Sequence, residues 1–182
     1  MASKISFVVK LKDLVKPEDI KGMTKNAKEN VNKKIGDIIV DKILEDTGNR
    51  RSAVTGQQWK GLSKAYSKIK SKTALPIANL DLHGDMLSSL KPRPREDHVE
   101  VGIFNTKQAK KADGHTGHGV FGVSDLPRRR FMPLNNGKLR SGIMKELARE
   151  AKQIVANAPK RAKPTTDTSA SSDAKFALTR GE

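Results

Sequence analysis

Two stretches of the chain alternate between apolar and polar residues, which is the pattern of a half-buried β-strand. The first stretch covers residues 5–11 and the second covers residues 99–103. Their apolar positions are Ile5, Phe7, Val9 and Leu11 in the first, and Val99, Val101 and Ile103 in the second. The sequence therefore predicts two strands that are far apart in the chain and that each turn one face toward a core.

Three other stretches repeat apolar residues at steps of three and four, as amphipathic helices do. One long helix is predicted from Pro17 to Asp46, ended by Thr47-Gly48-Asn49. A second is predicted over residues 80–90, where the prolines of 91–95 stop it. A third is predicted from a cap at residue 135 or 136 to about residue 158. The apolar stripes are Val31, Ile35, Ile38, Ile39 and Ile43 in the first helix, Leu80, Met86, Leu87 and Leu90 in the second, and Leu139, Ile143, Leu147, Ala151 and Ile154 in the third.

The remaining segments are rich in turn residues and lysine. A short basic helix is predicted over 62–72, a mobile loop over 105–127 and an extended segment over 128–134. Residues 159–182 are mostly Pro, Thr, Ser, Asp, Ala and Lys, so a disordered tail is expected. The predicted fold class is α+β. A long N-terminal helix and a C-terminal helix pack on a small, mainly antiparallel sheet in one domain of residues 1–158.

The composition points to partners outside the chain. The net charge is +16, which suits a polyanionic neighbour such as nucleic acid or an acidic protein surface, although solvated lysines would give the same total. Hydrophobic residues make up only 35% of the chain, so part of it is expected to be unstructured or buried against partners. The absence of cysteine excludes disulfides and thiolate metal sites. There is no apolar run of the ~20 residues that cross a bilayer, and no signal peptide, so no membrane partner is expected.

A search for catalytic motifs finds little. The phosphate-binding loop, the dinucleotide fingerprint and the nucleophile elbow are absent. His115 and His118, with His98, are candidate metal ligands, but a glycine-rich loop with exposed histidines explains them better. Asp81 and Asp85 lie four apart and could share a proton or a cation, while a solvated helix face is the simpler interpretation. We therefore expect no catalytic residues, no cofactor and no metal, and a protein that is not an enzyme.

Three basic clusters remain as candidate binding surfaces. They are Lys60, Lys64, Lys68, Lys70 and Lys72; Lys107, Lys110 and Lys111; and Arg128, Arg129 and Arg130. Adjacent arginines suit bidentate contacts with carboxylates or phosphates. Only Trp59 and Tyr66 accompany the first cluster, so base stacking is not expected. Any contact with nucleic acid would be to its phosphate backbone.

Four stretches in order resemble the virion morphogenesis, or tail-completion, proteins of Mu-like and related tailed phages. They are the long N-terminal helix ending in Thr47-Gly48; Trp59-Lys60-Gly61-Leu62-Ser63-Lys64-Ala65-Tyr66; Leu80 to Leu90 with Gly84 and Leu87; and Val101 to Phe104 followed by residues 109–119 and Pro127-Arg128-Arg129-Arg130-Phe131-Met132-Pro133-Leu134. The resemblance covers roughly residues 20–156. It implies a structural virion protein of the neck, at the head–tail junction, that completes or terminates the tail and is assembled in the host cytoplasm.

The resemblance also implies partners and roles. The subunit would form a homo-oligomeric ring, expected to be a hexamer, and would contact other neck, portal-side and tail proteins and the phosphate backbone of packaged DNA. Trp59, Leu62 and Tyr66 would fix the connecting segment to the core, with Gly84, Leu87 and Pro127 as further structural positions. The lysines of 105–127 and the three arginines would face neighbours or the DNA channel. Two rival functions are a free nucleic-acid-binding protein without sequence preference and a metal-dependent nuclease that uses Asp81, Asp85 and the histidines.

Overall fold

A three-stranded antiparallel sheet organises the fold. The computed structural model describes residues 4–64, 67–68, 71–72, 80, 85–117, 119–120, 128–134 and 137–160. The strands are β1 (Ile5–Lys10), β2 (Leu90–Pro94) and β3 (His98–Ile103), in the order β1-β3-β2. Phe7 of β1 and Pro92 of β2 both lie opposite Val101 of β3. The two strands predicted from alternation are confirmed, and the α+β class with them.

The prediction of a helix over 80–90 that stops at the prolines is wrong. Among the described residues, α4 covers Asp85–Ser88, Leu80 has a non-helical φ of +62°, and the chain enters β2 at Leu90; residues 81–84 lie outside the described part. Pro92 and Pro94 thus belong to a strand. Proline lacks the N–H that a ladder needs, so it is tolerated only on an edge strand such as β2.

The long N-terminal helix is two helices instead of one. After a short 3₁₀ turn η1 (Leu11–Asp13), α1 covers Pro17–Ile20 and α2 covers Lys25–Gly48. The break falls at Gly22, whose φ of +83° is a conformation that glycine adopts without strain. Thr24 then caps α2, because its Oγ1 accepts a hydrogen bond from the backbone N–H of Ala27 at 3.2 Å.

The glycine- and lysine-rich segment predicted as a mobile loop contains a helix. This helix, α5, covers Thr106–Thr116. The Asn105 side chain accepts from the N–H of Gln108 at its start, and Gly117 ends it with a φ of +68°. Ala109 and Ala112 bury its inner face, so small side chains rather than a broad apolar stripe dock it.

The C-terminal helix is confirmed as α6, Ser141–Ala156. Ile143, Leu147 and Ala151 are buried as predicted, and Val155 joins them. Arg140 occupies the N-cap position and residues 137–140 lie outside any helix, so the cap predicted at residue 135 or 136 is wrong. Those two residues themselves lie outside the described part of the chain. Of the tail predicted over 159–182, residues 161–182 lie outside the described part of the chain, while Lys160 forms an isolated β-bridge with Met23. Of the predicted basic helix, Ser67 and Ser71 donate backbone hydrogen bonds to Ser63 and Ser67, both at 2.9 Å.

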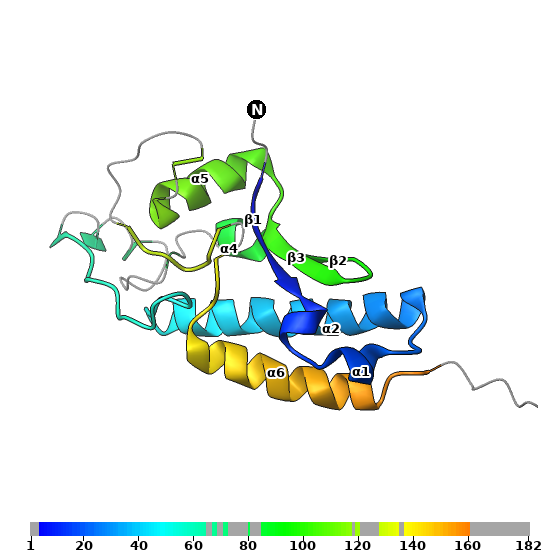
Figure 1. The fold of residues 1–182 in the computed structure, drawn as a ribbon. Helices are drawn as coiled ribbons and strands as arrows, with labels where there is room; N and C mark the ends of the chain where they lie inside the picture. The colour runs from blue at the N-terminus through cyan, green and yellow to red at the C-terminus, as the bar shows by residue number, and fades with distance from the viewer. Residues whose placement is uncertain are drawn as a thin grey trace, which may run out of the picture.

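The core lies between one face of the sheet, α2 and α6. In Figure 1, α6 runs beside α2, which crosses the sheet, and α5 lies at the end of the sheet where β1 begins. One cluster of buried side chains joins residues from Ile5 to Val155. Gly36 marks the closest approach of α2 to the sheet, since a Cβ there would lie 2.5 Å from Cβ of Pro92 and 2.8 Å from Cγ2 of Val99.

Candidate functional site

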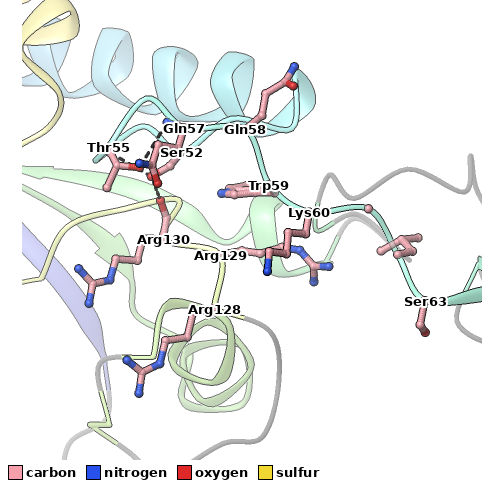
Figure 2. A pocket seen from close by; sticks show the side chains of 12 residues that line it. Ser52, Thr55, Gln57, Gln58, Trp59, Lys60, Ser63, Arg128, Arg129 and Arg130 are labelled. Atoms are coloured by element: carbon pink, nitrogen blue, oxygen red, sulfur yellow. Dashed lines mark hydrogen bonds between the residues drawn. The ribbon is translucent and has the colours of Figure 1, made fainter.

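A basic groove is formed by two stretches that are about 70 residues apart in the sequence. It has a volume of about 840 Å³, and residues 57–63 form one wall while 128–130 form the other (Figure 2). Four described residues of its lining are cationic and none is acidic: Lys60, Arg128, Arg129 and Arg130. The fold thus brings together parts of two stretches that carry the resemblance, the one that begins at Trp59 and the one that contains Arg128, Arg129 and Arg130.

Ser52 connects the two walls. Its hydroxyl donates to the backbone carbonyl of Arg130 and accepts from the backbone N–H groups of Val54 and Thr55 at 3.2 and 3.1 Å. Its own N–H donates to the carbonyl of Gln57 at 2.9 Å, which turns the chain back. A buried serine with these four contacts holds a loop in one conformation, so the groove has a defined shape before any ligand arrives.

The turn around Ser52 is attached to two helices by an ion pair. Asp46, near the end of α2, accepts a bidentate contact from Arg140, with Nε–Oδ2 of 2.8 Å and Nη2–Oδ1 of 3.1 Å. The Asp46 side chain is only 7% exposed and that of Arg140 is 32% exposed. The Asp46 hydrogen bonds raise the pKa of Arg140. The Arg140 N–H also donates to the carbonyl of Ala53 at 2.9 Å, so the pair orients the loop that carries Trp59.

The three consecutive arginines differ in their surroundings. Arg128 and Arg130 are exposed, whereas Arg129 is 7% exposed. The N–H of Arg129 donates to the carbonyl of His115 at 2.6 Å, and the methylenes of Arg128 pack on Gly117. The segment is therefore fixed at the C-terminal end of α5, where the helix dipole favours cations. Only Arg128 and Arg130 fit the expected outward-facing role.

The described residues do not place His115 in a cluster that could hold a metal ion. Burial, together with the positive charge of Arg129, lowers its pKa from 6.5 to about 4, so the imidazole is neutral at pH 7. His98 lies on β3 and contacts Asp97 at 2.7 Å, and His118 lies outside the described residues. Within the described ranges, no three His, Cys, Asp or Glu side chains gather as a metal site would require. Asp85 is exposed on α4, while Asp81 is not described.

Trp59 lies in the wall of the groove as its one described aromatic residue (Figure 2). Its N–H donates to the carbonyl of Arg50 at 2.8 Å, and its half-buried ring packs on the core. The buried indole Nε1 has no hydrogen-bond partner among the described residues. Leaving a buried donor without a hydrogen-bond partner costs about 1–3 kcal/mol of folding free energy. Packing against the core therefore does not by itself explain a tryptophan at this position.

The other predicted positions divide between the groove and distant surfaces. Leu62 lines the groove, and Leu87 packs against the core from α4. Lys107, Lys110 and Lys111 are exposed on α5 and do not line the groove. Lys64, Lys68 and Lys72 are exposed as well. Tyr66, Lys70, Gly84 and Pro127 lie outside the described residues.

Sequence reasoning missed Ser52, Asp46 and Arg140, which give the groove its shape. The one available signal was Asp46, which lies three residues after Ile43 on the apolar stripe of α2, where a carboxylate needs a buried partner. Chemically, the groove offers cations, amides and an apolar wall, and its described lining holds no pairing of nucleophile and base. This arrangement has the charge and the donor groups that suit an anionic ligand.

Comparisons with family models, curated proteins and solved structures find no match for this chain. The resemblance to tail-completion proteins therefore depends on the four motif stretches alone. None of the helices in the described ranges combines the length and the apolar character needed to cross a membrane.

Proposed function

We propose that this protein is a structural subunit, without enzymatic activity, of the head–tail junction of a tailed phage. Copies would form a ring in the neck, and the basic groove would be a contact site for neighbouring proteins. The observation that carries the proposal is the meeting of two motif stretches, 59–62 and 128–130, as the walls of one groove that a serine clamps together. A shared role of the two stretches in contacting a neighbouring protein would account for their meeting in one groove.

The groove also determines which variant tests the proposal. Because Arg129 is buried and bonded through its backbone to α5, replacing all three arginines would disturb the fold. The double variant Arg128→Ala/Arg130→Ala removes only exposed charges. Lys33→Ala/Lys34→Ala, on the exposed side of α2, removes the same charge elsewhere and is the matched control.

We expect purified particles to contain this polypeptide, with heads and tails that fail to join when the arginine variant replaces the natural chain. Electron microscopy of lysates would count free heads and free tails against joined particles, and circular dichroism would verify that the variant folds. Particles that lack the polypeptide would contradict the proposal. So would normal joining with the arginine variant.

A second function, binding of nucleic acid without sequence preference, is favoured by one observation. Lys107, Lys110 and Lys111 are exposed on one helix, and no acidic partner faces them among the described residues. Binding of mixed-sequence duplex DNA across a range of salt concentrations would test it, because phosphate neutralisation makes affinity fall steeply with salt. Tight binding that depends on these lysines would favour this function over the structural one.

A further inference from the structure

The groove wall contains a short stretch of backbone with unused hydrogen-bonding groups. Lys60, Gly61 and Leu62 form no backbone hydrogen bond with any other described residue, although Trp59 just before them does. They lie along the groove in an irregular conformation outside any helix or strand. Such a free edge of backbone can pair with an extended polypeptide, which binds through its own N–H and C=O groups.

We propose that the groove binds an extended, Asp- and Glu-rich segment of another protein. The segment's backbone would pair with residues 60–62. Its carboxylates would meet Lys60 and, farther along the segment, Arg128 and Arg130, whose side chains extend away from the 57–63 wall (Figure 2). This inference rests on the proposed function only in treating the groove as a contact site, and it does not require a place in a virion.

The charges of the groove support an acidic occupant. Lys60, Arg128 and Arg130 are exposed, and no ion pair joins any of them to a described acidic residue. The described lining contains no carboxylate that would repel a carboxylate ligand. Arginine presents a planar fork of donors that matches a carboxylate in bidentate geometry.

The lining favours a polypeptide over nucleic acid. A phosphate backbone offers acceptors only, whereas free N–H and C=O groups at 60–62 and the amides of Gln57 and Gln58 suit a ligand with both donors and acceptors. Sequence-independent binding of single strands uses several aromatic platforms, and the described groove has Trp59 alone, with its ring half-buried.

The occupant is another protein rather than a second copy of this one. The acidic residues of this chain form runs of at most two, at 18–19, 45–46 and 96–97. A segment with many carboxylates must therefore come from a different chain.

Trp59 provides the assay, since it is the only tryptophan in the sequence and lies in the groove wall. The full chain would be titrated with a peptide of alternating Glu and Gly, with the same peptide carrying Gln for Glu, and with a mixed-sequence DNA duplex. We expect the Glu peptide to change the tryptophan fluorescence in a saturable way. The Gln peptide and the duplex should leave it unchanged.

Two pairs of variants separate charge from backbone pairing. Arg128→Ala/Arg130→Ala should weaken binding of the Glu peptide by about tenfold or more, and Lys33→Ala/Lys34→Ala should not. Gly61→Pro, which removes an N–H and disfavours strand pairing, should weaken it, whereas Gly61→Ala should not, because a Cβ at this position meets no atom within 4 Å.

Several outcomes would overturn the inference. They are no fluorescence change with the Glu peptide, equal binding of the Gln peptide, displacement of the Glu peptide by the duplex, or equal binding by the two Gly61 variants. The result is separate from the proposed function. Peptide binding by a protein absent from particles would refute the virion role alone, and a particle protein that binds no acidic peptide would refute this inference alone.

Discussion

The contact between α2 and the sheet at Gly36 allows a quantitative prediction. In an exposed helix, replacing glycine with alanine would stabilise the protein by about 1 kcal/mol, because glycine loses more backbone entropy on folding. At Gly36 the new methyl group would lie 2.5 Å from Cβ of Pro92 and 2.8 Å from Cγ2 of Val99. Overpacking a core typically costs about 1–3 kcal/mol, and here both neighbours belong to strands that cannot move independently. An overlap this severe should cost about 3 kcal/mol, the upper end of that range, so after the gain of about 1 kcal/mol we expect a net loss of about 2 kcal/mol.

Thermal unfolding measures this loss directly. For a chain of this size, a loss of about 2 kcal/mol lowers Tm by roughly 4–8 °C. Gly48→Ala is the matched control, because Gly48 ends the same helix and a Cβ there would meet no atom within 4 Å. That variant should keep the natural Tm or exceed it slightly. If Gly36→Ala were as stable as the natural protein, α2 could not lie as close to β2 and β3 as described.

Two further predictions concern the groove's supports. Asp46→Asn removes the charged partner of Arg140, so it should lower the free energy of unfolding by about 1–3 kcal/mol in denaturant titrations. Asp41→Asn, on the exposed face of α2, is the control and should have no effect. Equal stabilities of the two variants would contradict the role of the ion pair. As the pH falls from 6.5 toward 4, the unfolded chain takes up a proton at residue 115 before the folded chain does, because the folded-state pKa of His115 is lowered to about 4. The natural protein should therefore lose up to about 3 kcal/mol of stability across this window, and His115→Gln should lose less; identical pH profiles for the two would refute the burial of His115.

Periodicity in the sequence was sufficient for the elements that bury large side chains. Alternation located β1 and β3, and steps of three and four located α2 and α6. Periodicity did not locate the elements whose buried side chains are small or whose sequence contains prolines. Helix α5 docks through Ala109 and Ala112, which do not stand out in a segment of glycine and lysine. Strand β2 contains two prolines, which resemble a helix stop until an edge position is known.

The candidate site was predictable only in its parts. The arginine run and the Trp59 segment are visible in the sequence, but nothing local shows that they face each other. Their contact depends on Ser52, Asp46 and Arg140, which act through tertiary hydrogen bonds that no periodicity records. The different burial of Arg128 and Arg129 also follows from where α5 ends.

The prolines of β2 have a consequence for how this protein behaves while it folds at high concentration. A ladder with β3 uses the N–H groups that point inward, so Pro92 and Pro94 take positions whose missing N–H groups would point outward. The outer edge of β2 therefore offers too few backbone N–H donors to pair with a strand of another molecule. Lys91 and Arg93, which are exposed and alternate with the prolines, add repulsion between like chains. β2 thus acts as a gatekeeper against amyloid-like growth on its side of the sheet.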